Sequence, residues 1–132
     1  MGEKKEILVV EDHQSIRLVL SNCLGKTHRV VTCKDGLEAL SWLSQGNLPD
    51  LIILDRHMPR ISGLEFLTNI RTSGLFREIP VLILSGEENN DNIEELKRLG
   101  ISGFVAKPFN PAKINESIEA ILQRQTLRAL AR

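Results

Sequence analysis

Polar residues of the kinds that bind cations and phosphate follow the short apolar runs of this chain. Glu11 and Asp12 come after the first run, Asp55 after the third, Ser85 after the fourth and Lys107 after the fifth. If these runs are parallel strands, their carboxyl ends meet at one edge of a sheet and the five side chains converge there. The predicted pocket of carboxylates, a hydroxyl and an amine suits a divalent cation and a phosphoryl group.

The predicted pocket is electrostatically strained when it is empty. Two carboxylates about 5 Å apart repel by roughly 3 kcal/mol at an effective dielectric near 20, so either a carboxyl pKa rises or a cation binds. An oxygen-only donor set favours Mg²⁺ or Mn²⁺ over zinc. Asp55 can then attack phosphorus to form an acyl phosphate. Lys107 would supply positive charge to the phosphoryl oxygens, and Ser85 a hydrogen bond.

Apolar runs and helical stripes alternate along the chain and predict the elements that position these residues. The runs cover residues 7–10, 30–31, 51–54, 81–84 and 103–106, and their continuous apolar character indicates strands buried on both faces in the centre of the sheet. Stripes with helical spacing cover residues 16–24, 37–40, 64–70, 93–99 and 114–122. The pattern is that of an α/β fold, a doubly wound (βα)5 sheet with right-handed crossovers.

Length and composition limit the possible functions. With 132 residues and 42% hydrophobic content, the chain is expected to form one domain. Seventeen basic and seventeen acidic residues give no net charge, so we expect neither a direct nucleic-acid partner nor a membrane partner. The apolar runs are far shorter than the roughly 20 residues that span a bilayer, and the N-terminus lacks a signal-peptide core. We therefore expect a cytoplasmic protein, with Cys23 and Cys33 as buried, reduced thiols.

The polar positions also carry a family resemblance over residues 5–124. The motifs are Glu11-Asp12, then Leu54-Asp55-Arg56-His57-Met58-Pro59 with Gly63, then Leu84-Ser85-Gly86 and Lys107-Pro108-Phe109. Together they resemble the response regulator receiver domain of two-component signalling. The resemblance implies a flavodoxin-like three-layer sandwich whose parallel strands lie in the order 2-1-3-4-5. We expect residues 1–124 to form this domain, and residues 125–132, which hold two arginines and no acid, to be a helical extension or tail.

The resemblance also assigns roles in the pocket. It implies that Glu11, Asp12, Asp55 and the main-chain carbonyl of His57 bind Mg²⁺. Asp55 would accept the phosphoryl group from a histidine kinase or a phosphotransfer protein. The chain would then be a signalling switch rather than an enzyme, with only self-phosphorylation and autodephosphorylation.

Further roles implied by the resemblance concern the response to phosphorylation. Ser85 and Phe104 would be switch residues, Lys107 the lysine of the phosphoryl site, and the peptide bond before Pro108 would be cis. The fourth helix, fifth strand and fifth helix would form the surface that controls an unidentified downstream protein, or a homodimer contact.

Some positions depart from the usual family pattern. Arg56 and His57 stand where smaller or amide residues are more common, and Ser62 replaces an acid. His57 lies two residues beyond Asp55, and Glu87 lies two beyond Ser85. We hypothesise that this pair flanks the path of the attacking water and sets the lifetime of the acyl phosphate.

Three readings within two-component signalling stay open, and two other classes of protein are weighed against them. A stand-alone receiver and a phosphate shuttle in a phosphorelay share the same motifs, and a receiver excised from a larger regulator is also compatible. A phosphatase of the haloacid-dehalogenase type would need a second acid where His57 stands. A flavodoxin-like FMN binder would need a phosphate loop where Glu11 and Asp12 stand, and those carboxylates repel an anion.

Overall fold

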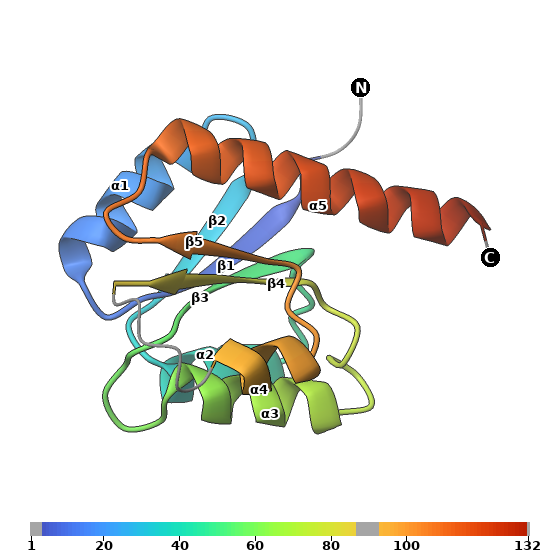
Figure 1. Cartoon of the computed structure of the whole chain (residues 1–132), viewed down its shortest axis with the longest axis horizontal. Coiled ribbons are helices and arrows are strands. Elements are labelled where there is room, and N and C mark those ends of the chain that lie inside the picture. Colours follow the sequence, from blue (N-terminus) through green and yellow to red (C-terminus); the bar gives the residue numbers. More distant parts are fainter. Residues whose placement is uncertain (1–3, 87–92, 132) are drawn as a thin grey trace.

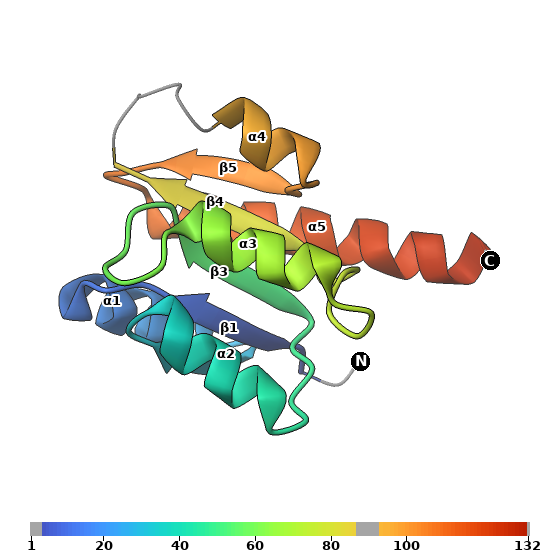
Figure 2. The same ribbon diagram turned by 90° about the horizontal axis from the view of Figure 1, so that it is seen from below.

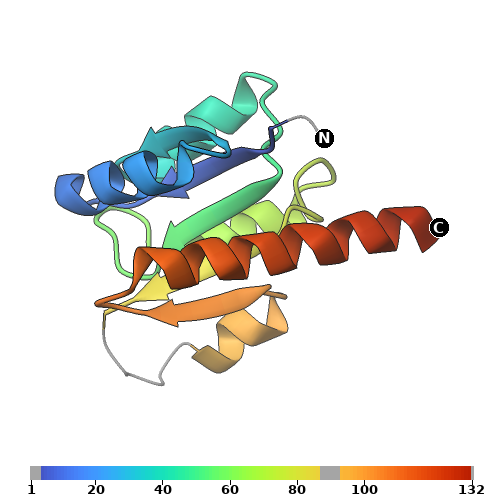
Figure 3. The ribbon, with the colours of Figure 1, turned by 90° about the horizontal axis from the view of Figure 1, so that it is seen from above.

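The computed structural model describes residues 4–86 and 93–131 as a sheet between two layers of helices. Within these residues, five parallel strands pair in the order β2-β1-β3-β4-β5. In Figure 1, α1 and α5 cover one face of the sheet and α2, α3 and α4 cover the other, an arrangement that Figures 2 and 3 show from below and above. The strands are β1 (Glu6–Val10), β2 (Arg29–Cys33), β3 (Leu51–Asp55), β4 (Val81–Ser85) and β5 (Gly103–Ala106). The helices are α1 (Gln14–Leu24), α2 (Gly36–Ser44), α3 (Gly63–Thr72), α4 (Ile93–Arg98) and α5 (Pro111–Ala131).

The three central strands are buried on both faces because they are apolar at nearly every position. In β1, β3 and β4, alternate side chains enter two separate cores, one under α2, α3 and α4 and one under α1 and α5. Leu8, Ile52 and Ile83 belong to the first core, and Val9 and Ile53 to the second. This double burial fixes the register of the strands, since a slip by one residue would exchange the two faces.

The predicted doubly wound (βα)5 sandwich and its strand order are confirmed. The second strand is longer than its apolar pair suggested, because Arg29, Thr32 and Cys33 also pair with β1. The expected extension after residue 124 is helical through Ala131, as part of one continuous α5. The domain boundary at residue 124 stays a prediction. No helix within the described parts of the chain is both long enough and apolar enough to span a bilayer.

Two residues of the predicted α1 stripe are not in the core. Val19 is 45% exposed, and Cys23 is only half-buried, with Sγ 3.9 Å from the carbonyl oxygen of Pro111. The buried face of α1 is narrower than the stripe, because only Leu20 and Leu24 of this helix are fully buried, while Ile16 packs against the core partly exposed. Cys33 is buried as expected, and burial with the nearby carboxylate of Glu38 raises the pKa of its thiol to about 12.

Side-chain caps fix the ends of the helices that follow the strands. Ser62 accepts a hydrogen bond from the N–H of Glu65, whose carboxylate accepts one from the N–H of Ser62, which is a capping box at the start of α3. Asn110 accepts from the N–H of Ala112, as the Asn110-Pro111 pair predicts. The first residues of α3 and α5 are thereby held just beyond strand ends.

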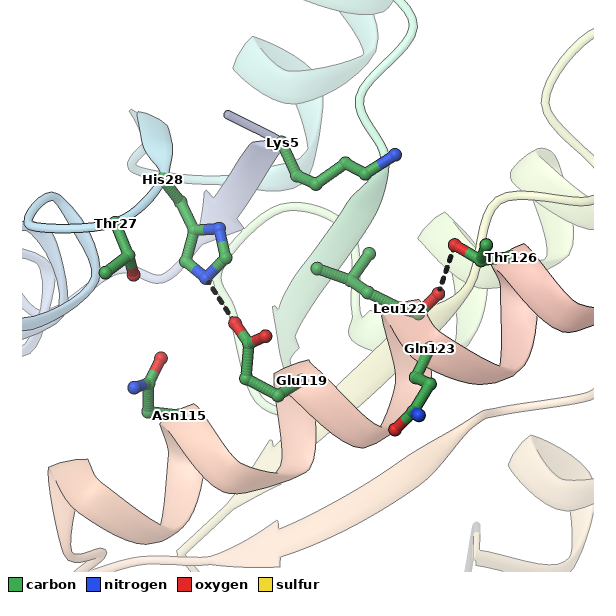
Figure 4. Close-up of a pocket in the computed structure, with 8 residues that line it drawn as sticks. All are labelled: Lys5, Thr27, His28, Asn115, Glu119, Leu122, Gln123 and Thr126. Atoms are coloured by element: carbon green, nitrogen blue, oxygen red, sulfur yellow. Dashed lines mark hydrogen bonds and ion pairs between the residues drawn. The ribbon is translucent and has the colours of Figure 1, made fainter. Parts of the chain in front are cut away.

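A histidine joins the opposite end of the sheet to α5. His28, at the entrance to β2, is 6% exposed, and its Nε2 lies 3.0 Å from Oε2 of Glu119 (Figure 4). Lys5, Asn115 and Gln123 line the same groove. Because none of the strand-end residues lines it, this groove is separate from the predicted pocket.

We predict that Gly63→Ala destabilises the fold by about 1–3 kcal/mol. A Cβ at residue 63 would lie 2.8 Å from the carbonyl oxygen of Asp55 and 2.9 Å from Cα of Arg56, so backbone atoms would have to move. Denaturant unfolding measures the loss. Gly74→Ala is the matched control, because nothing lies within 4 Å of a Cβ there. Equal effects of the two changes would contradict the steric argument.

Candidate functional site

The carboxyl ends of the strands meet at one edge of the sheet, as their arrowheads show in Figure 2. Glu11 follows β1, and Asp55 and Ser85 are the last residues of β3 and β4. These three residues are at most 2% exposed. Asp12 is half-buried at the rim. The structure therefore brings together the carboxylates that the sequence predicted to converge.

The acidic residues form one cluster with a histidine. Glu11, Asp12, His13 and Asp55 each offer a ligand atom, and these atoms all lie within 4.8 Å of one another. The N–H of His13 donates to Oε2 of Glu11 over 3.0 Å, and Nδ1 lies 2.9 Å from the same oxygen. Arg17 holds the loop that carries the acidic pair, since its Nη1 donates to the carbonyl oxygens of Glu11 and Asp12.

Lys107 follows the edge strand β5, and its side chain contacts two of the carboxylates. Its Nζ lies 3.0 Å from Oε1 of Glu11 and 3.3 Å from Oδ1 of Asp55. Its N–H donates to the carbonyl oxygen of Ser85 over 2.7 Å, and the bond to Pro108 is cis, as predicted. One ammonium thus contacts carboxylates that follow two different strands, which compensates part of their mutual repulsion.

The pKa of Asp55 is unusually high for a carboxylic acid. Burial, followed by the negative charge of Glu11, raises the pKa of Asp55 to about 7, although Lys107 acts in the opposite direction. The N–H of His57 donates to Oδ1 over 3.2 Å, whereas Oδ2 is buried and no described residue donates to it. This oxygen therefore requires a proton or a cation.

The pKa values of Asp12 and His13 also depart from their ordinary values, in directions that fit a cation site without its ion. Burial alone would raise the pKa of Asp12, but hydrogen bonds with Asp55 and Glu11 and the nearby His13 lower it below its ordinary value. The hydrogen bond with Glu11 and the charge of Asp12 raise the pKa of His13. When it is protonated, His13 would partly neutralise the cluster. The sequence analysis did not assign His13 to the cluster, although its place directly after two acids was the available signal.

The residues present fit a hard divalent cation. Three carboxylates converge, and each has a buried oxygen that accepts no hydrogen bond from the described residues. Ion pairs reach these oxygens in Glu11 and Asp12 but not Oδ2 of Asp55. Oxygen donors of this kind match Mg²⁺ and Mn²⁺. The main chain of the exposed His57 lies next to Asp55, because its N–H donates to Oδ1. Cation binding by the carbonyl oxygen of His57 stays a prediction.

The predicted switch residues lie on the face that α4 covers. Ile83 and Phe104 are paired across β4 and β5, and Phe104 is 39% exposed. The hydroxyl of Ser85 accepts a hydrogen bond from Nη1 of Arg56 over 3.4 Å. Arg56 is 3% exposed, a burial that the sequence did not suggest. Glu87, the predicted partner of His57, lies outside the described residues.

Comparisons with known proteins agree on one family. The sequence profile of the response regulator receiver domain matches residues 7–119. Chemotaxis protein CheY-3 of Vibrio cholerae is 30% identical over 126 residues, which are 94% of this chain and 96% of that protein. The alkaline phosphatase synthesis transcriptional regulatory protein PhoP of Bacillus subtilis is 36% identical over 95% of this chain and 51% of that protein. The solved structure of chemotaxis response regulator CheY4 of Vibrio cholerae superposes with a TM-score of 0.82 at 32% identity, covering 90% of this chain and 99% of that one.

We predict that Asp55→Asn makes the protein more stable in metal-free buffer above pH 7. The native carboxyl keeps a proton up to about pH 7 that the unfolded chain releases near 3.8, so wild-type stability falls as the pH rises between these values. Each pKa unit corresponds to roughly 1.4 kcal/mol. The amide does not titrate and avoids this loss.

Urea unfolding with a chelator present, repeated across the pH range, measures the difference. The variant should exceed the wild type by about 4 kcal/mol above pH 7, and the advantage should vanish as the pH approaches 3.8. A difference that stays constant with pH would show that Asp55 is not the titrating group.

Proposed function

We propose that Asp55 accepts a phosphoryl group and that the chain works as a signalling switch, because this chain belongs to the response regulator receiver domain family. The observation that carries the proposal is the contact of Lys107 with both Glu11 and Asp55 beside Asp12. A nucleophile, an acidic cation site and a counter-charge for phosphate are there within one pocket. Receiver domains are switches rather than conventional enzymes.

In the proposed transfer, a carboxylate oxygen of Asp55 attacks the phosphorus of a phosphohistidine on a histidine kinase or phosphotransfer protein. The new P–O bond forms as the P–N bond breaks, and the imidazole leaves with the electron pair and takes a proton. Lys107 and the N–H of His57 hold Oδ1 of Asp55, which fixes the orientation of the nucleophile. Hydrolysis of the acyl phosphate would cleave the P–O bond between phosphorus and Asp55 and release inorganic phosphate.

A bound Mg²⁺ would reduce the repulsion between the carboxylates and an incoming phosphoryl group. Glu11, Asp12 and Asp55 would hold it with their side chains, and His57 with its carbonyl oxygen. Because Asp55 titrates near pH 7 in the metal-free protein, Lys107 and His13 alone leave the nucleophile partly protonated. The ionised form required for attack would dominate once a cation replaces that proton.

The phosphodonor would approach over an apolar groove beside the pocket. Ile16 and Val19 of α1 line it together with Lys107, Pro108 and Phe109. The exposure of Val19 next to the apolar side chains of Ile16, Pro108 and Phe109 supports a binding role for this surface. An amphipathic helix of a phosphotransfer protein would cover it and bring a phosphohistidine to Asp55.

The output surface would consist of α4, β5 and α5. Ser85 would donate a hydrogen bond to a phosphoryl oxygen, and Phe104 would move from its half-exposed position. A downstream protein, or a second copy of the chain, would sense this change only through different affinities for the two states. A phosphate shuttle in a phosphorelay would use the same pocket and differ in its partners.

The rival chemistries lack support in the pocket. Residue 57 is an exposed histidine, not the second acid that a haloacid-dehalogenase phosphatase needs. An FMN phosphate would face Glu11 and Asp12, whose charges repel it.

We predict that acetyl phosphate with Mg²⁺ adds about 80 Da to the wild type, the mass of one phosphoryl group. Asp55→Asn should gain nothing because it lacks the nucleophile. Intact-mass spectrometry reads both results. Asp50→Asn is the matched control, since Asp50 only accepts from the N–H of Glu6 at the opposite end of the sheet. Labelling of Asp55→Asn to the wild-type extent would refute the assignment.

We further predict that His57→Ala changes the decay rate of the acyl phosphate severalfold without preventing its formation. The imidazole is exposed, and its main-chain N–H is already bonded to Asp55, which alanine preserves. Release of inorganic phosphate after removal of acetyl phosphate gives the rate, and combining the change with Glu87→Ala tests the pair. Unchanged decay in the double variant would eliminate the lifetime hypothesis.

A further inference from the structure

A buried arginine lies beside the proposed phosphoryl site, and no carboxylate of the described residues is paired with it. Arg56 is 3% exposed, and among the described residues it forms no ion pair. Its Nη1 donates to Oγ of Ser85, and its Nε is buried with no acceptor in the described parts of the chain. A guanidinium stays charged at physiological pH and carries five donors. Burial with so few partners is unfavourable, which indicates a role beyond packing.

The strand register explains why Arg56 faces Ser85. Asp55 is paired with Leu84, and the N–H of Arg56 donates to the carbonyl oxygen of Leu84, so Arg56 and Ser85 are opposite each other in the next position. Successive side chains along a strand alternate between faces. Ile83 belongs to the core under α2, α3 and α4, so Ser85 and Arg56 lie on that same side.

We propose that Arg56 is a positioning residue that holds the hydroxyl of Ser85 on the α4 side of the sheet while Asp55 is unphosphorylated. The inference rests on the proposed function, in which this hydroxyl donates to a phosphoryl oxygen on Asp55. Its Oγ must then move toward the pocket, and the bond to Nη1, at 3.4 Å, is already near the limit of a hydrogen bond. Phosphorylation therefore separates Arg56 from Ser85.

Because of this separation, Arg56 opposes the phosphorylated state. Loss of a bond to a buried cation opposes the phosphorylated state, so removal of Arg56 should favour that state. A guanidinium that instead acted on the phosphoryl group through its positive charge would have the opposite effect, because its removal would weaken phosphoryl binding. The sign of the effect therefore distinguishes the two roles.

The test uses the full chain with Mg²⁺ and beryllium fluoride, which binds carboxylates as a mimic of a phosphoryl group. Arg56→Met keeps the volume of the side chain and removes the donors. We expect it to bind beryllium fluoride roughly threefold to tenfold more tightly than the wild type by calorimetry, as lost hydrogen bonds of this kind would give. Equal or weaker binding overturns the proposal.

A double-mutant cycle shows whether the effect passes through Ser85. In a Ser85→Ala background, Arg56→Met should leave the affinity for beryllium fluoride unchanged, because the hydroxyl that it positions is absent. The same gain in both backgrounds would mean that Arg56 acts without Ser85 and would overturn the proposal. Arg29→Met, at an exposed arginine at the start of β2, is the matched control and should show no gain.

A second measurement covers the case in which Arg56→Met does not fold. In the wild type, NMR signals of the Arg56 guanidinium should exchange slowly with water in the free protein and faster after beryllium fluoride is added. Unchanged exchange would overturn the proposal. A wild type that neither binds beryllium fluoride nor gains phosphate on Asp55 would instead refute the proposed function, so the two failures are distinguishable.

Discussion

Repulsion among carboxylates that the sheet forces together is the constraint on which the rest of the pocket depends. Glu11 and Asp55 are almost completely buried, and Asp12 lies at the rim of the same cluster. Lys107 and His13 supply positive charge, yet the pKa of Asp55 still rises to about 7. A divalent cation would relieve this repulsion, and the acidic cluster that would bind it is already assembled in the protein without phosphate.

The fold separates this strained edge from the parts that hold it together. The two cores on either side of the central strands fix the register, and the capping box at Ser62 fixes the start of α3 behind Asp55. At the opposite edge, Arg71 donates to the carbonyl oxygens of Ile79, Leu99 and Gly100, which joins α3 to the segments around it. Stabilising contacts away from the pocket allow unfavourable charges within it.

The alternation of apolar runs and helical stripes was sufficient to predict a parallel sheet and the meeting of Asp12, Asp55 and Lys107 at its edge, because the carboxyl ends of parallel strands lie together. The strand order came from the family resemblance, since apolar strands alone do not fix it. Side-chain directions beyond the strand ends were not predictable in the same way. His13 joins the cluster because the chain turns into α1 directly after Asp12, and Arg56 is buried because the register sets it opposite Ser85. Val19 was assigned to the core by helical spacing, but the width of the contact between α1 and the sheet decides burial, and periodicity does not give that width.

The position of Lys107 has a consequence for the newly made protein. The lysine follows β5, the last strand of the described residues, yet its ammonium contacts Glu11, which follows β1, and Asp55, which ends β3. A polypeptide still emerging from the ribosome, with residues 1–100 already collapsed, holds the acids without their counter-charge. The charge balance of the pocket is therefore completed only after β5 has joined the sheet, and a chain that has been made no further than β4 lacks it.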